Sequence, residues 1–139
     1  MLVLDTDHFS ALERNSEIGR QLTARLRASD SEKALSIPTV QESLRGWLAE
    51  INRHQDLDRQ IVPYAKLQQV VEALGNWLIL SWDAECAALF RRFRSDGVRI
   101  GTLDLKIACI VLAHDATLLT RNERDFSLVP DLRFENWLD

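Results

Sequence analysis

The sequence predicts an α/β fold: a three-layer α/β/α sandwich with a central, mostly parallel sheet. Short apolar runs of strand length alternate along the chain with longer amphipathic segments of helical periodicity. Such alternation is typical of parallel sheets whose two faces are covered by crossover helices. The 139 residues contain no proline-, glycine- or serine-rich linker and no repeat, so we expect a single domain over residues 1–139.

The N-terminal part of the chain is expected to form two strands and two helices. Residues 2–4 are apolar and make the first strand. Thr6 or Asp7 caps the helix that follows, which runs to about residue 13. Residues 16–28 have an apolar face at helical spacing and make a second helix, and residues 34–37 make the second strand.

The middle of the chain is expected to be mainly helical. Thr39 and Glu42 have the spacing of a capping box, which predicts that Pro38 and Thr39 open a helix that ends near residue 54. Residues 56–76 are expected to be mostly helical, with Pro63 in a first turn.

The C-terminal half is expected to add three strands and two helices. Ser81 or Asp83 starts a helix to residue 95, which Gly97 ends, and Thr102 caps a helix to about residue 114. The expected strands are residues 77–80, residues 117–119 and a short last strand that includes Phe134.

Composition excludes several classes of protein. The formal net charge of −4 argues against attraction of nucleic acid to the whole surface and leaves room for a local basic patch. The longest apolar runs, such as residues 107–113, are too short to cross a bilayer, and the first residues lack the basic region of a signal peptide. We therefore expect no membrane contact and a cytoplasmic location. Cys86 and Cys109 lie in apolar helical segments without metal-ligand spacing, which indicates buried thiols.

Four acidic residues are expected at the same end of the sheet. They are Asp5 after the first strand, Glu42 after the second, Asp104 in the first turn of the helix opened by Thr102, and Asp125 after the fourth strand. Each has a structural explanation as a cap, a capping box, a partner of a helix dipole or a solvated loop acid. Ligands of open α/β sheets bind outside the carboxyl ends of the strands, so we expect the four side chains to converge there.

Converging carboxylates indicate a bound cation. Two carboxylates ~5 Å apart repel each other by roughly 3 kcal/mol at an effective dielectric near 20. A divalent cation removes this repulsion, and oxygen-only ligands favour the hard ions Mg²⁺ and Mn²⁺. Such ions polarise phosphoryl oxygens and generate hydroxide from bound water, so the pattern predicts phosphate chemistry.

Four sequence blocks carry a family resemblance. They are Leu4-Asp5-Thr6-Asp7, Thr39-Val40-Gln41-Glu42 with Gly46, residues 101–108, and Thr120-Arg121-Asn122 through Asp125-Phe126. In order and spacing, the chain resembles the PIN-domain endoribonucleases, and within them the VapC-type toxins of toxin–antitoxin pairs. The resemblance implies an α/β/α fold and Mg²⁺- or Mn²⁺-dependent hydrolysis of RNA phosphodiesters by a metal-bound water, with one or two metals left open.

The same resemblance implies roles for individual residues. Asp5 and Asp104 are expected to bind the metal directly, and Glu42 and Asp125 directly or through water. The expected supporting residues are Thr6, Thr120 and Asn122. Many relatives have Asn at the position of Asp7. Asp7 either adds negative charge near the metal or caps the helix, and we adopt the helix cap as the interpretation here. His8 is interpreted as facing away from the site.

Substrate and protein partners are also expected. The candidate RNA contacts are Arg45, Arg91, Arg92, Arg94 and Arg99, with a solvated helix face as the alternative for the last four. The resemblance implies a cognate antitoxin and a homodimer. Trp47 lies on a helix that, by the resemblance, contributes to the antitoxin groove.

Two other functions stay open at this point. One is a catalytically inactive PIN-like module that binds RNA or protein without cutting. The other is a phosphatase of the haloacid dehalogenase type, because Asp5-Thr6-Asp7 after a strand also fits an Asp-x-Asp nucleophile motif. Phe9 departs from that motif, and a chromogenic phosphate ester assay distinguishes the two chemistries.

Overall fold

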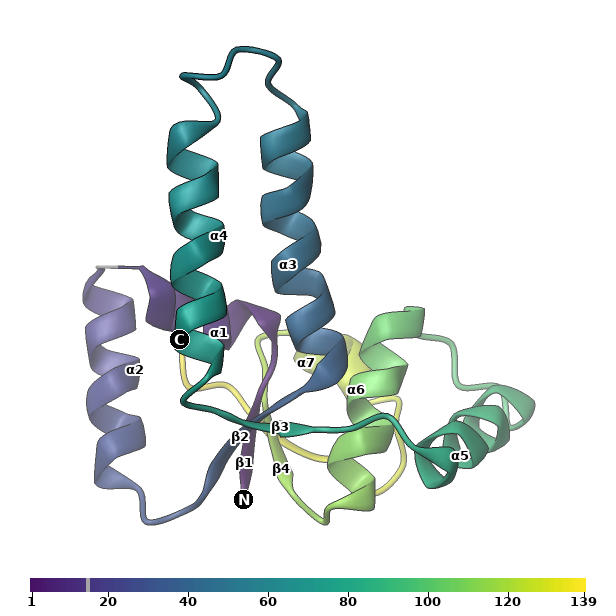
Figure 1. Ribbon diagram of the computed structural model, residues 1–139. Helices are drawn as coiled ribbons and strands as arrows, with labels where there is room; N and C mark the ends of the chain where they lie inside the picture. The colour runs from purple at the N-terminus through teal and green to yellow at the C-terminus, as the bar shows by residue number, and fades with distance from the viewer. Residues whose placement is uncertain (15) are drawn as a thin grey trace.

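A parallel β-sheet forms the centre of the computed structural model, which describes residues 1–14 and 16–139 (Figure 1). Its five strands have the order β3-β2-β1-β4-β5, and every neighbouring pair is parallel. The strands are β1 (Leu2–Leu4), β2 (Lys33–Ser36), β3 (Leu78–Leu80), β4 (Thr117–Leu119) and β5 (Arg133–Glu135). The predicted α/β class is confirmed, and all five predicted strands are present, with boundaries within one residue where a range was predicted.

Helices cover both faces of the sheet (Figure 1). One face packs on α1 (Thr6–Glu13), α2 (Glu17–Ala28) and α4 (Ile61–Leu74). The other packs on α5 (Ala84–Ser95), α6 (Thr102–Ala113) and α7 (Glu123–Phe126). In β1, Leu2 and Leu4 join the first of these cores and Val3 joins the second, so the central strand is buried on both sides.

A helical hairpin stands out from the carboxyl end of the sheet (Figure 1). Its arms are α3 (Ile37–Asn52) and α4, which pack along each other. The helix predicted from residue 56 begins only at Ile61. The reason is a local turn, in which the Asp56 carboxylate accepts a hydrogen bond of 2.9 Å from the Asp58 backbone N–H and competes with helix formation.

Two predicted helix starts are wrong by a few residues. Asp5, not Thr6 or Asp7, caps α1, because the backbone is still extended at Asp5 and its Oδ1 accepts the His8 N–H at 2.9 Å. Asp7 lies exposed in the first turn. Gly101 occupies the N-cap position of α6, so Thr102 is its first helical residue and not its cap.

The predicted capping box of α3 does not form. Ser36 occupies the N-cap position and Pro38 fits the first turn, so the helix begins at Ile37. Thr39 is consequently inside the helix, where its hydroxyl accepts a hydrogen bond of 3.3 Å from Ser36 Oγ. The Glu42 carboxylate is therefore available for another contact.

The two cysteines and the lengths of the helices were also the subject of predictions. Cys86 and Cys109 are buried free thiols, and burial raises the pKa of Cys109 to about 12, so both act as small apolar side chains. Within the described residues, no helix is long and apolar enough to cross a membrane.

Candidate active site

The four predicted acids converge at the carboxyl end of the sheet. Asp5 follows β1, Glu42 lies in the second turn of α3, Asp104 lies in the first turn of α6 and Asp125 lies in α7. The pKa of Asp104 is raised, first by burial and then by the negative charges of Glu42, Asp125 and Asp5. Asp104 is therefore close enough to the other three carboxylates to feel their negative charges in the folded chain.

Asp5 is the most firmly held of these acids. Its backbone N–H donates to the Leu119 carbonyl at 3.0 Å, which joins β1 to the end of β4. Its Oδ1 accepts a hydrogen bond of 2.9 Å from the His8 backbone N–H. The same oxygen lies 3.1 Å from His8 Nδ1. No residue in the described part of the chain donates a hydrogen bond to Asp5 Oδ2. One carboxylate oxygen is anchored, and the other is open.

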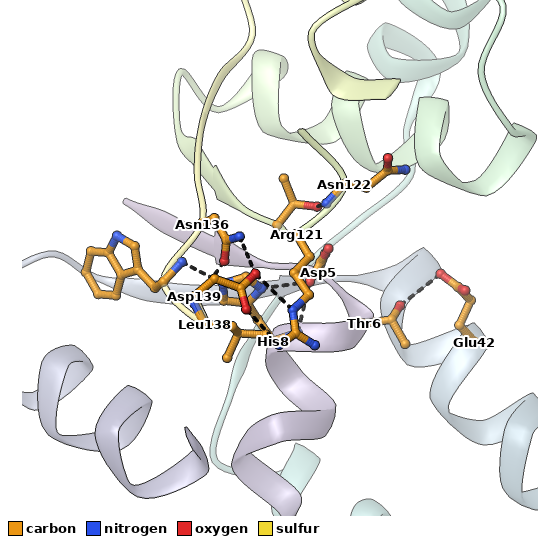
Figure 2. Close-up of polar contacts among 11 residues, drawn as sticks. Asp5, Thr6, His8, Glu42, Arg121, Asn122, Asn136, Leu138 and Asp139 are labelled. Carbon is orange, nitrogen blue, oxygen red and sulfur yellow. Dashed lines mark hydrogen bonds and ion pairs between the residues drawn. The ribbon is translucent and has the colours of Figure 1, made fainter. Parts of the chain in front are cut away.

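His8 does not face away from the site, and that interpretation was wrong. Its ring is fully buried between Asp5 and the segment that follows β5 (Figure 2). His8 Nε2 accepts the Trp137 backbone N–H at 3.2 Å. That nitrogen has no free lone pair, so His8 is not a general base. The spacing Asp5-x-x-His8 across a helix start is the only sequence signal for this contact.

Glu42 is held by a residue from another element. Thr6 Oγ1 donates to Glu42 Oε1 at 2.9 Å (Figure 2), so α1 and α3 are linked at the site. The predicted supporting position of Thr6 therefore has a specific partner. Glu42 also lines two cavities, one on each side of it.

Asn122 bridges the other two acids. Its Nδ2 donates to Asp125 Oδ2 at 3.0 Å and to Asp104 Oδ2 at 3.3 Å, while its Oδ1 accepts the Asp125 N–H at 3.3 Å and caps α7. Thr120 is fully buried, and its Oγ1 accepts the Asn122 N–H at 3.0 Å. The two supporting residues thus form a chain from the end of β4 to both carboxylates.

Arg121 was not predicted as part of this region. Its guanidinium donates to both oxygens of Asp139, at 3.0 and 3.2 Å (Figure 2). These hydrogen bonds, followed by the charges of Asp139, Asp7 and Asp5, raise the pKa of Arg121. A permanent cation is therefore kept beside Asp5.

A groove of about 610 Å³ opens between α1, α3 and α4. Its floor includes the apolar side chains of Phe9, Trp47 and Val70, and its rim carries Glu13 and Lys66. It reaches Thr6 and Glu42 at one end. The groove is therefore apolar at its floor, charged at its rim and continuous with one residue of the acid cluster.

A second cavity of about 520 Å³ lies between α3 and the start of α6. Two cations, Arg45 and Lys106, and two acids, Glu42 and Asp104, line it. Lys106 was not predicted. Arg45 is exposed. Among the residues that the structure describes, no ion pair joins Arg45 to Glu42.

The other predicted cationic residues lie on or after α5. Arg91, Arg92 and Arg99 are exposed. Arg94 instead donates to the carbonyls of Val98 and Ile100, both at 2.8 Å, and fixes the loop that leads into α6. A role of these four residues in RNA binding stays a prediction, and for Arg94 the structure offers a different role.

The donor chemistry of the cluster fits a hard divalent cation. Within the described ranges, no three Asp, Glu, His or Cys side chains are already grouped as a metal site. The Asp104 carboxylate nevertheless feels the negative charges of the other three acids, Asp5 Oδ2 accepts no hydrogen bond from a described residue, and all the donors are oxygens. Asp5, Asp104, Glu42 and Asp125 are the residues that could hold Mg²⁺ or Mn²⁺.

Known protein families and curated proteins include matches to this chain. A PIN domain is matched over residues 2–132. Ribonuclease VapC2 of Rickettsia felis is 36% identical over 68 residues, a match that spans 46% of this chain and 51%, about half, of that relative. Ribonuclease VapC1 of Haemophilus influenzae strain R2866 is 26% identical over 143 residues, covering 97% of this chain and 96% of the relative.

Solved structures agree on the fold. A toxin-antitoxin complex from Klebsiella pneumoniae contains a chain that superposes with a TM-score of 0.70 at 21% identity, covering 95% of each chain. No finding favours the haloacid dehalogenase alternative. Since the match extends over nearly the whole sequence, this chain belongs to the PIN domain family.

Proposed function

We propose that this protein is an endoribonuclease toxin that hydrolyses RNA phosphodiesters at the four-acid cluster with Mg²⁺ or Mn²⁺. The observation that carries the proposal is the convergence of Asp5, Glu42 and Asp125 on Asp104, whose pKa is raised first by burial and then by the negative charges of the other three. It is supported by the PIN domain match and by the names of two relatives, both ribonucleases.

The residues of the cluster have distinct roles in this proposal. When bound, the divalent cation supplies Lewis acidity at a phosphoryl oxygen and charge for the leaving oxygen. Asp5 and Asp104 hold it. Glu42, positioned by Thr6, and Asp125, positioned by Asn122, orient the attacking water, and one of these two carboxylates accepts the proton that the water loses. Arg45 and Lys106 in the adjoining cavity bind the phosphates that flank the scissile bond.

Comparison of the wild type with Asp5→Asn tests the activity. The substrate is total RNA, assayed with Mg²⁺, with Mn²⁺ and with chelator. We expect cleavage by the wild type only with metal and a loss on the order of 10³-fold for Asp5→Asn. Equal cleavage by both proteins would contradict the assignment. Metal binding in calorimetry without turnover on any RNA would favour a catalytically inactive module.

The antitoxin forms the second part of the proposal. A segment of a cognate antitoxin occupies the α1–α3–α4 groove, with apolar side chains on Phe9, Trp47 and Val70. The groove is supported as the site by its apolar floor and by the toxin-antitoxin complex formed by a protein of this fold. Its connection to Glu42 means that an occupant could also block the acids.

Co-expression with the neighbouring open reading frame tests the partner. We expect growth arrest that this neighbour relieves, and we expect Trp47→Glu to prevent the relief while RNA cleavage persists. Relief that survives Trp47→Glu would place the partner elsewhere. Sequencing of new RNA 5′ ends during the arrest would identify the RNA target.

A homodimer and a cytoplasmic location complete the proposal. Several apolar side chains of α4 are exposed, which supports association with a second copy: Ile61, Val62, Tyr64 and Val71. Sedimentation of the purified chain measures the oligomeric state. Cell fractionation measures the location.

A further inference from the structure

The hydrogen-bond partners of the buried His8 ring select one tautomer. The Trp137 backbone N–H can only donate, so His8 Nε2, 3.2 Å away, must accept. The ring proton then resides on Nδ1, which donates to Asp5 Oδ1 across 3.1 Å. Only the neutral Nδ1–H tautomer satisfies both contacts, and the ring that makes them is 0% exposed.

This tautomer fixes one half of the Asp5 carboxylate. Oδ1 receives two N–H donors, from the His8 backbone and from the His8 ring. Two donors at one oxygen stop the carboxylate from rotating about its Cβ–Cγ bond. Oδ2, to which no described residue donates, is therefore presented in one orientation.

The segment 136–139, which we name the C-terminal strap, follows β5 and contains Trp137. Figure 2 labels three of its residues, Asn136, Leu138 and Asp139. The Arg25 guanidinium of α2 lies 4.1 Å from the centre of the Trp137 ring, and the indole N–H donates to Glu135 Oε2 at 2.7 Å. Leu138 is buried in the same core as Leu4. The strap is thus attached to α2, to the edge strand β5 and to the hydrophobic core that contains Leu4.

The far end of the strap reaches the other side of the site. Asn136 Nδ2 donates to Asp139 Oδ2 at 2.8 Å, and Asp139 is held by Arg121 at the end of β4. Arg121 lies between Thr120 and Asn122, the pair that supports Asp104 and Asp125. The strap therefore connects the support of Asp5 to the support of the other carboxylates.

We propose that His8 is a positioning residue, and that the C-terminal strap sets its tautomer so that Asp5 Oδ1 is anchored and Oδ2 is the oxygen that binds the divalent cation. This inference rests on the proposed function, since it concerns the cation of the same site. In families of metalloenzymes, loss of a residue that orients a metal ligand weakens metal binding by roughly 10–100-fold.

Two substitutions of His8 separate its two contacts. In His8→Asn, an amide N–H occupies the place of Nδ1 and keeps the donation to Asp5. In His8→Gln, an amide oxygen reaches Trp137 and the donation to Asp5 is lost. His54→Gln is the matched control, because His54 lies near the far end of α3, where its Nε2 is 3.5 Å from Glu50.

Binding of Mn²⁺, measured by electron paramagnetic resonance without RNA, is the main readout. We expect His8→Gln to weaken Mn²⁺ binding by roughly 10–100-fold, and His8→Asn and His54→Gln to stay within about threefold of the wild type. Wild-type affinity in a folded His8→Gln protein would overturn the inference. If Asp5→Asn also binds Mn²⁺ as the wild type does, the proposed function fails with it; if only Asp5→Asn is impaired, this inference alone fails.

Nitrogen-15 NMR of the imidazole ring in the metal-free wild type gives an independent test. We expect a proton on Nδ1 of His8 and a shift typical of an accepting nitrogen at Nε2. A proton on Nε2 would overturn the inference, whatever the variants do. This measurement uses only the wild-type protein, so it depends neither on enzymatic activity nor on the folding of a variant.

Discussion

Asp5 and Glu42 are supported in different ways, although they belong to one site. Asp5 ends the central strand, is 7% exposed, and has a carboxylate oxygen bound by two N–H groups. Glu42 lies on a helix that extends away from the sheet, and Thr6 Oγ1 is its one hydrogen-bond partner among the described residues. We call the surroundings of Asp5, which the sheet and the C-terminal strap restrain, the fixed side of the site. The surroundings of Glu42, which has the single hydrogen bond to Thr6 just described, are the adjustable side.

The largest expected effect is at the fixed side. Asp5→Glu keeps the charge but adds one methylene, so the carboxylate cannot both cap α1 and meet the His8 ring. We expect RNA cleavage to fall by about 10²-fold or more and the free energy of unfolding to fall by about 1 kcal/mol, as for a lost N-cap. Single-turnover kinetics and urea unfolding measure the two effects. Cleavage within threefold of the wild type would contradict a fixed side.

The matching change at the adjustable side should cost less. Glu42→Asp removes one methylene, and the shorter acid loses only one hydrogen bond, the contact with Thr6. We expect a loss of about tenfold in cleavage and no change in unfolding beyond about 0.5 kcal/mol. If Glu42→Asp is as damaging as Asp5→Glu, the two sides do not differ.

A third prediction concerns Asp104, which feels the negative charges of acids on both sides of the site. The pKa of Asp104 lies above its ordinary value of 3.8, so the folded protein holds this proton more tightly than the unfolded chain does. Stability is therefore lost as the pH rises from 3.8 through the folded pKa, and the loss is complete above it. Asp104→Asn removes the charge.

We expect metal-free Asp104→Asn to melt roughly 2–5 °C above the wild type at neutral pH, and at the same temperature below pH 3.8. Differential scanning calorimetry with chelator, over a series of pH values, measures this difference. Added Mn²⁺ should reverse its sign, because only the wild type gains from binding. A lower Tm for metal-free Asp104→Asn would mean that the acids do not repel each other.

The smallest effect is expected at the outer end of the strap. Asp139→Asn weakens the exposed pair with Arg121 and leaves Leu138 buried. We expect a Tm within about 1 °C of the wild type and a loss of only a few-fold in cleavage. Arg25→Gln, which removes the contact with the Trp137 ring, is the comparison, and both variants are measured by the same melting and cleavage assays. A large loss from Asp139→Asn would move the main attachment of the strap to Arg121.

The fixed side was partly predictable from the sequence. Residues 2–4 are apolar on both faces and end in an acid, and the same pattern of strand and acid recurs along the chain, so the sheet and the convergence of acids follow from local patterns. The helix starts were less predictable. Asp5 and Thr6 are both good caps, and only the end of β1 decides between them.

The contacts made by His8 and Glu42 were not predictable in this way. Trp137 lies 129 positions from His8, and Thr6 lies 36 positions from Glu42. A capping box was the better local explanation for Glu42, and it failed because Ser36 and Pro38 start the helix earlier. Such pairings depend on how the whole sheet is assembled, which local spacing does not encode.

The order of the strands has a consequence for synthesis. Strand β1 lies between β2 and β4 in the sheet. Leu119, which accepts the backbone hydrogen bond of Asp5, and Trp137, which donates to His8, both come from the last quarter of the chain. While the ribosome is still translating these residues, Asp5 can have its local contacts with His8 but neither of the two long-range ones. The complete set of restraints on the first acid can therefore form only after translation has passed residue 137.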